Sequence, residues 1–206
     1  MGRRRCSMSC IMSLEGLPSS NAQMSEHEQT DRPKLHLHHR PIEIERKFLV
    51  ANDEWRRCTV GSVSIRDGLI AASEGRKVRV RISEDLATIV IKGPRTGIVR
   101  PEFEYEIPLP DAERILSSIC GDDWLEKQRF FVQEAGAMWH VDVYCGLLQG
   151  TVLAEVELKD ETQQLSIPGW VGSEVTGDPF YRKVNMRARA LKRASAAAAS
   201  IQSAPG

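Results

Sequence analysis

The sequence predicts a mainly β protein of the α+β class, in which eight antiparallel strands form a closed barrel and helices pack outside it. Eight stretches alternate apolar with charged or polar residues at a period of two, the pattern of a strand with two unlike faces. Short breaks containing glycine, proline or aspartate separate several of them, as in a meander. Few segments have a helical pattern and no repeat has a fixed period, so we expect one folded domain.

The expected strands follow one another from Pro41 onward. Breaks at Asp85, Gly93-Pro94, Gly136 and Gly146 divide the charged and apolar stretches. In chain order the strands are 42–50, 63–70, 77–83, 87–92, 100–108, 126–133, 137–145 and 151–159.

Three segments have helical character. Asn52 to Cys58 is predicted as a short helix capped by Asn52. Asp111 to Cys120 is predicted as a helix because Ile115, Leu116 and Ile119 form an apolar stripe and Gly121 follows it. The segment 179–199 has a helical composition that fades into alanine and serine, and we expect 193–206 to be a frayed tail.

Residues 1–40 are rich in serine, glutamine, histidine and charge without periodicity, which predicts a disordered tail before a domain over 41–192. The histidines of the run His36-Leu37-His38-His39 are interpreted as solvated chain rather than a metal site. The basic start is followed by residues too polar for a signal peptide, and Met24 is an alternative start. We therefore expect a cytoplasmic protein.

The bulk properties narrow the class of protein. The chain has 206 residues, with 28 lysines and arginines against 28 aspartates and glutamates, and this balance argues against a general nucleic-acid binder. Five scattered cysteines without a CxxC pair indicate reduced thiols and no soft-metal site. No stretch approaches the roughly 20 apolar residues that span a bilayer.

Charged residues share one face on several expected strands. In Glu43-Ile44-Glu45-Arg46-Lys47 the three odd-numbered charges lie two apart and therefore on one side. A single such strand is ordinarily amphipathic with its polar face in water. Like charges two apart repel, however, so their recurrence indicates opposite charges on neighbouring strands and a ligand or ion between them. The recurring charges are Arg79 and Arg81, Glu102, Glu104 and Glu106, Lys127 and Arg129, Asp142, and Glu155 and Glu157.

If these faces point inward, the barrel encloses a polar tunnel, and its apolar outer faces need cover from helices or from a second subunit in a homodimer. Carboxylate oxygens suit Mg²⁺ or Mn²⁺, whereas arginine and lysine suit phosphate oxygens. No glycine-rich phosphate loop and no Ser/His/Asp motif is present. The pattern therefore indicates metal-assisted phosphate chemistry without a nucleophilic side chain.

This ordered series resembles the CYTH superfamily of triphosphate tunnel metalloenzymes, in its small bacterial form. The resemblance covers about residues 41–190. It is carried by the ExExK pattern of Glu43-Ile44-Glu45-Arg46-Lys47 and by Val78-Arg79-Val80-Arg81, Ile91-Lys92-Gly93, Arg100-Pro101-Glu102-Phe103-Glu104-Tyr105-Glu106-Ile107-Pro108, Lys127-Gln128-Arg129, Trp139-His140-Val141-Asp142-Val143-Tyr144, Ala154-Glu155-Val156-Glu157-Leu158 and Asp178-Pro179-Phe180-Tyr181.

The resemblance implies an eight-stranded tunnel that binds a triphosphate and requires Mg²⁺ or Mn²⁺. It implies a catalytic group of Glu43, Glu45, Lys47 and Glu157, in which the three glutamates hold the metal. It implies further acidic members in Asp142, Glu155, Glu102 and Glu104. The triphosphate-binding cations it implies are Lys47, Arg79, Arg81, Lys92, Lys127 and Arg129, with Lys183 at the tunnel mouth.

Two positions depart from the family pattern. Small bacterial members often carry Gln-Gly-Tyr-Leu where this chain has Asp67-Gly68-Leu69-Ile70, so a phenol that could order water or phosphate is missing. Lys183 stands near the place of a family asparagine. The missing tyrosine bears on substrate range and rate more than on the fold.

The leading hypothesis is a metal-dependent triphosphatase acting on inorganic tripolyphosphate. The alternatives within the superfamily are an adenylate cyclase and a thiamine triphosphatase, and the chain has little aromatic material to stack an adenine, with three tyrosines, five phenylalanines and four tryptophans. A non-catalytic polyphosphate-binding module is the alternative of a different class, but it would not need the acids.

Overall fold

The computed structural model describes residues 41–202, with side chains to residue 197. The expected tail over 1–40, including its histidine run, lies outside the described residues. In chain order the strands are β1 (Ile42–Val50), β2 (Thr59–Ser73), β3 (Arg76–Ser83), β4 (Leu86–Lys92), β5 (Val99–Glu106), β6 (Trp124–Glu134), β7 (Ala137–Tyr144), β8 (Val152–Glu157) and β9 (Val171–Glu174). The helices are η1 (Glu54–Cys58), α1 (Leu109–Ser118), η2 (Gly146–Leu148), η3 (Pro179–Tyr181) and α2 (Lys183–Gln202).

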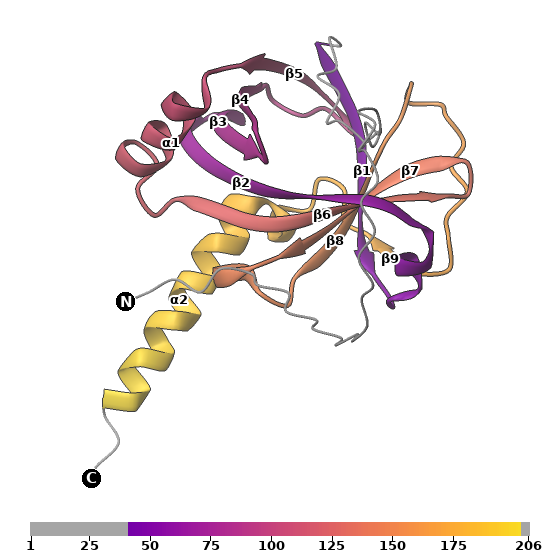
Figure 1. Cartoon of the computed structure of the whole chain (residues 1–206). Coiled ribbons are helices and arrows are strands. Elements are labelled where there is room, and N and C mark those ends of the chain that lie inside the picture. The colour runs from indigo at the N-terminus through magenta and orange to yellow at the C-terminus, as the bar shows by residue number, and fades with distance from the viewer. Residues whose placement is uncertain (1–40, 203–206) are drawn as a thin grey trace, which may run out of the picture.

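Eight of these strands close into an antiparallel barrel, as predicted (Figure 1). The sheet order is β5-β4-β3-β2-β6-β7-β8-β1-β9, and a further pairing of β1 with β5 closes the ring. Strand β1 is the seam: Glu43 lies opposite Arg100 of β5, and Glu45 lies opposite Glu157 of β8. Because the ring is closed, each of the eight barrel strands pairs with a neighbour on both sides. The barrel therefore has an inner and an outer face.

The predicted strands are confirmed, with differences at their ends. Strand β2 begins at Thr59 and ends at Ser73, longer at both ends than expected, because Gly61 and the bulge between Leu69 and Ala71 interrupt its alternation without ending its pairing. Strand β9 has four residues and no alternation, so the sequence pattern did not reveal it.

The helices also differ from their predicted bounds. The first is a 3-10 helix, and the Asn52 side chain accepts a hydrogen bond from the Glu54 amide at 3.0 Å. Helix α1 begins at Leu109, two residues before Asp111, because Pro110 suits a first helical turn. The expected frayed tail over 193–206 is wrong up to Gln202, since α2 continues through its alanines, the strongest helix formers.

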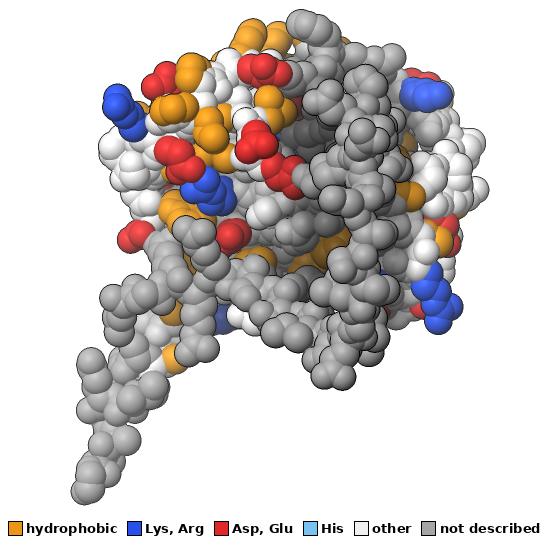
Figure 2. All heavy atoms as spheres, viewed as in Figure 1, with side chains coloured by type: hydrophobic (Ala, Val, Ile, Leu, Met, Phe, Trp, Pro, Cys, Tyr) orange, Lys and Arg blue, Asp and Glu red, His pale blue; other side chains and the backbone are white. Residues whose placement is uncertain are grey.

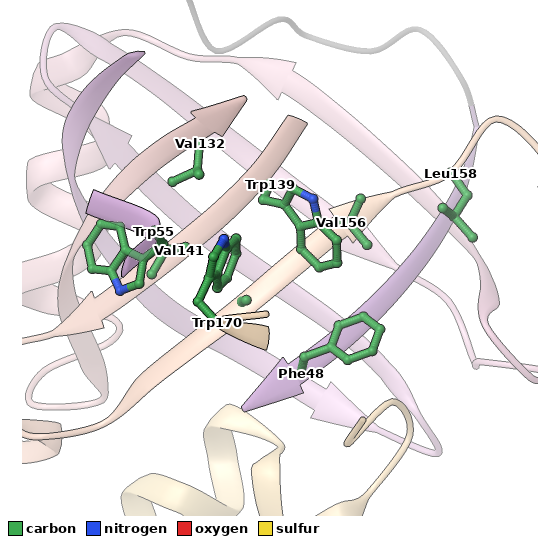
Figure 3. Packing of buried hydrophobic residues seen from close by; sticks show 9 residues of the cluster. Phe48, Trp55, Val132, Trp139, Val141, Val156, Leu158 and Trp170 are labelled. Carbon is green, nitrogen blue, oxygen red and sulfur yellow. The ribbon is translucent and has the colours of Figure 1, made fainter. Parts of the chain in front are cut away.

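The hydrophobic core lies outside the barrel wall. Figure 3 shows Phe48, Trp139 and Val156 from the outer faces of β1, β7 and β8 packed with Trp55 of η1 and with Trp170. The Trp139 and Trp170 rings meet edge to face at 5.4 Å between centroids. Helix α1 covers the outer face of β3 and β4 in the same way, through Ala112 and Leu116.

One part of the outer wall is left uncovered by the described chain. Phe103 and Tyr105 of β5 are 42% and 57% exposed. Hydrophobic side chains gather at the upper left of Figure 2, where Figure 1 places β5 and α1. The helices thus cover most outer faces, as expected, and a homodimer that would cover this one stays a prediction.

Two expected absences can be compared with the structure. Among residues 41–202 no helix is long and apolar enough to cross a membrane. Within that range Cys58, Cys120 and Cys145 form no disulfide.

We expect Gly68→Ala to destabilise the protein. A Cβ at this position would lie 2.6 Å from Leu116 Cδ2 and 2.8 Å from Cys120 Sγ, so β2 and α1 would be forced apart. Overpacking of this kind costs about 1–3 kcal/mol of unfolding free energy, measurable by urea denaturation. The matched control is Gly169→Ala, where nothing lies within 4 Å, and it should leave that free energy nearly unchanged. Equal effects of the two substitutions would contradict the close packing of α1 on β2.

Candidate active site

The barrel encloses one large cavity of about 910 Å³. Its wall consists mainly of inward-facing side chains from the barrel strands, and residues of the connecting segments and the first residue of α2 line it as well. The expected charged residues that line it are Glu43, Glu45, Lys47, Arg79, Arg81, Lys92, Glu102, Glu104, Arg129, Glu155, Glu157 and Lys183. The alternation seen in the sequence therefore turns these charges inward, because side chains two apart on a strand share a face.

Cations surround Glu43 of β1 on three sides. Lys92 Nζ lies 2.8 Å from Glu43 Oε1, Arg95 Nη2 lies 3.2 Å from Oε2, and Arg100 also donates to Oε2. Burial alone would raise the pKa of Glu43, but Lys92 and Arg100 outweigh it and hold that pKa well below its usual range. Lys92 also contacts Glu102 at 2.7 Å, and burial raises the pKa of Glu102 to about 7.

A second group of ion pairs joins β6, β7, β8 and β1. Arg129 donates to both oxygens of Asp142, at 2.7 and 2.8 Å, and to Glu155 Oε2 at 2.7 Å. Lys127 also donates to Asp142, and Lys47 lies 2.8 Å from Glu155 Oε1. This bidentate arrangement fixes the guanidinium plane of Arg129 against the cavity wall.

The third group is centred on Asp67 of β2, which the sequence analysis did not include in the site. Its carboxylate accepts from Arg79 and from Lys183 Nζ at 2.9 Å, and Arg81 Nε lies 3.7 Å away. Arg81 reaches further to Glu104 at 2.7 Å. Burial opposes the charge of Asp67, yet Arg79, Lys183 and Arg81 hold its pKa well below the usual range.

Glu45 pairs with cations over a longer distance than Glu43 does. Arg95 Nη2 lies 3.4 Å from Glu45 Oε1, and Glu45 lies directly opposite Glu157 in the register of β1 and β8. Burial, followed by the charges of Glu155 and Glu43, raises the pKa of Glu45. Like charges opposite each other on paired strands are destabilising, so this pair marks a place where a cation would stabilise the protein.

Within residues 41–202, no three histidine, cysteine or acidic side chains already stand together as a metal cage. Most acids of the tunnel are turned toward lysine or arginine instead. The chemistry of Glu45 and Glu157 fits a hard divalent cation, which prefers carboxylate oxygens. Glu43 can join them as a metal ligand only if the lysine and arginines that pair with it bind another anion instead.

Two expected site residues point into the barrel but are packed beneath the cavity lining, since Asp142 lies opposite Arg129 in the register and Lys127 is two residues from it. Asp142 has no exposed surface and Lys127 is 2% exposed, and neither lines the cavity. Both oxygens of Asp142 are occupied by hydrogen bonds from Arg129 and Lys127. In this structure Asp142 orients Arg129 and Lys127, and a role for it in metal binding stays a prediction.

The structure also adds residues that the sequence analysis missed. Arg95 lies in the β4–β5 connection, where no alternation could reveal it. Arg100 shares the face of Glu102 and Glu104, so strict alternation would have identified it. Asp67 was hidden because its face of β2 otherwise carries Val63 and Ile65. Further cavity-lining residues not expected are Lys77, His140 and Arg182.

His140 of β7 lines the cavity in its neutral form. Its Nδ1 lies 3.4 Å from Arg129 Nη1, and its ring packs edge to face on Phe131. Burial, followed by the charge of Arg129, lowers the pKa of His140 to about 3. The imidazole is therefore uncharged near neutral pH.

This shift predicts a pH-dependent loss of stability in acid. Below pH 6.5 the unfolded histidine takes up a proton that the folded one refuses until about pH 3, so folding loses up to about 1.4 kcal/mol per pH unit through this window. His140→Gln removes the contribution, and urea denaturation from pH 4 to 7 should give a shallower slope for the variant. Identical slopes would refute the neutral, buried imidazole.

Comparisons with known proteins identify the family of this chain. The sequence profile of the CYTH domain matches residues 41–177. An inorganic triphosphatase of Acetivibrio thermocellus is 42% identical over 144 residues, covering 70% of this chain and 92% of the relative. An inorganic triphosphatase of Nitrosomonas europaea is 32% identical over 146 residues, covering 68% and 93%.

Among solved structures, the crystal structure of an inorganic triphosphatase aligns with a TM-score of 0.51 at 29% identity, covering 70% of this chain and 97% of that chain. The resemblance drawn from the charged strands is thus confirmed. The matched profile spans more than half of the chain, and both relatives are covered almost in full. The chain belongs to the CYTH domain family.

Proposed function

We propose that the protein hydrolyses inorganic triphosphate with a divalent metal ion, Mg²⁺ or Mn²⁺. The observation that carries the proposal is the enclosed cavity whose wall presents carboxylates and guanidinium or ammonium groups to the same space. A compact polyanion with bound metal ions carries both negative and positive charge. The cationic groups of such a wall would recognise the first and its carboxylates the second. The two curated relatives are named inorganic triphosphatases, which supports this choice.

The phosphate oxygens would bind the cations of the wall. Arginines of β3 and β6 offer planar forks that match phosphate oxygens in pairs, whereas lysines act as point charges. Lys127 lies beneath the lining and contributes through Asp142, which it shares with Arg129. The proposed triphosphate-binding residues are Lys47, Arg79, Arg81, Lys92, Lys127, Arg129 and Lys183.

The carboxylates would hold the metal. Glu45 and Glu157 face one another across the β1–β8 register, and Glu43 precedes Glu45 on the same face. Glu155, Glu102 and Glu104 are further acids of the lining that could join them. A bound divalent ion would polarise a phosphoryl oxygen and activate water.

Binding requires an exchange of partners inside the wall. Lys92 and Arg100 now hold Glu43, and Lys47 holds Glu155. Triphosphate oxygens offer these cations a stronger anion, and a divalent cation offers the released carboxylates a stronger partner. The internal ion pairs thus keep both sets of groups charged and in place before the ligands arrive.

Water is the proposed nucleophile, because the cavity lining contains neither serine nor cysteine among the described residues. The wall orients the triphosphate for in-line attack and excludes bulk water from it. The aromatic lining consists of Phe131 and Tyr181 beside His140, which is little for stacking a purine. This favours the inorganic substrate over ATP or thiamine triphosphate.

Incubation of the purified protein with tripolyphosphate and Mg²⁺ or Mn²⁺ should release phosphate, and chelation of the metal should abolish the release. ATP and thiamine triphosphate in parallel, with cyclic AMP as a second readout, separate the other reactions. Cyclic AMP from ATP would make the protein a cyclase. Tight binding of tripolyphosphate without phosphate release under any divalent ion would make it a binding module.

Glu45→Gln should lower kcat for tripolyphosphate by at least about 100-fold, because the variant removes a proposed metal-holding charge while keeping the shape. It should not lower the melting temperature, since it also removes the repulsion between Glu45 and its acidic neighbours. The control is Glu113→Gln, which breaks an exposed pair with Arg66 far from the cavity lining and should keep full activity. Unchanged activity and metal dependence in Glu45→Gln would show the carboxylate assignment to be wrong.

A further inference from the structure

We propose that Asp67 is a positioning residue that joins the first turn of α2 to the arginines of β3, so that α2 forms part of the active site. This inference rests on the proposed triphosphatase function. It gives a role to a residue that does not itself line the cavity.

Asp67 lies opposite Arg81 in the β2–β3 register, so its side chain points into the barrel, and it is 1% exposed. Arg79 and Lys183 donate to its two carboxylate oxygens, and Arg81 approaches to 3.7 Å. All three cations line the cavity, whereas Asp67 does not. The carboxylate therefore contacts the cavity-lining cations from within the packed barrel interior, without itself lining the cavity.

The carboxylate is held on a rigid support. Gly68, the next residue of β2, lies so close to α1 that a Cβ there would collide with Leu116 and Cys120. Arg79 also donates to the Asp67 carbonyl at 3.4 Å. Strand β2 can shift little at this point, so Asp67 can fix the direction of its partners.

Asp67 is the acid that pairs with both Arg79 and Lys183. Without Asp67, these two cations and Arg81 would face one another in a buried region. Burial, Lys127 and the two arginines already lower the pKa of Lys183 well below its usual range, and Asp67 opposes that shift. Loss of the carboxylate would therefore displace or discharge Lys183.

Helix α2 has two other anchors that do not involve the cavity. Met186 is buried with Leu125 and Tyr144, and Arg187 lies 3.1 Å from Asp123. Figure 1 shows α2 leaving the barrel and extending away from it. Asp67 is thus needed less to hold the helix as a whole than to place its first side chain in the wall.

The test compares Asp67→Asn with Arg187→Gln and the surface control Glu113→Gln. Asp67→Asn should lower kcat for tripolyphosphate at least ten-fold and change KM less, because cations are misplaced but not removed. Arg187→Gln weakens an anchor of α2 outside the cavity and should keep kcat within three-fold. An equal loss in both variants would overturn the positioning role, since the effect would then come from docking of the helix alone.

A double variant tests whether Asp67 and Lys183 act through the ion pair between them. The combined loss of kcat in Asp67→Asn with Lys183→Met should be smaller than the product of the two single losses, because both remove the same ion pair. Losses that multiply would overturn the proposed link. If Asp67→Asn does not fold, Lys183→Met tests the contact from the α2 side and should lower kcat at least ten-fold.

Limited trypsin digestion tests the link to α2 without an activity assay. Asp67→Asn should be cleaved after Lys183 at least five-fold faster than the unchanged protein and Glu113→Gln, since the first turn of α2 is released. Unchanged cleavage overturns the link to α2. Faster cleavage in a protein that never hydrolyses tripolyphosphate would keep the link and overturn only the proposed function.

Discussion

The structure depends on opposite charges that face one another inside a closed barrel. An ionised side chain removed from water is costly unless a partner of opposite charge and good hydrogen-bond geometry compensates. Glu43, Asp67 and Asp142 meet this condition, each with two or more cations. Burial acts against each of these charges, and the paired cations keep the carboxyl groups ionised.

The polar interior determines where the hydrophobic core can lie. Since alternate residues point inward with charge, the apolar residues between them face outward and need a second layer. Helix α1 supplies it over β3 and β4, and η1 with Trp170 supplies it over β1 and β6 to β8. The covering segments therefore act on the site indirectly, because they stabilise strands whose inward-facing like charges would otherwise repel one another. Gly68 and Asp67 show this connection at adjacent residues, one packing under α1 and the other holding the cations.

The sequence predicted most of the barrel because strand alternation is a local property. Runs such as Val78-Arg79-Val80-Arg81 indicate which residues share a face whatever the partners are. It could not predict which charges meet across strands, because pairing depends on the register of segments far apart in the chain. Thus Asp142 was expected to bind metal, but its two oxygens are taken by Arg129 and Lys127. Asp67 was missed because a lone acid on an apolar face gives no repeating signal.

If a metal ion and a triphosphate bind as proposed, the ion pairs imply that they bind in concert. An anion that took Lys92 and Arg100 from Glu43 would leave a buried carboxylate without partners, which is strongly unfavourable. A divalent cation that took Glu155 from Lys47 would leave a buried ammonium group in the same position. Each ligand therefore binds better when the other is present, and this coupling is reciprocal. A wall of internally paired charges is in this way selective for a polyanion that arrives with its own cations.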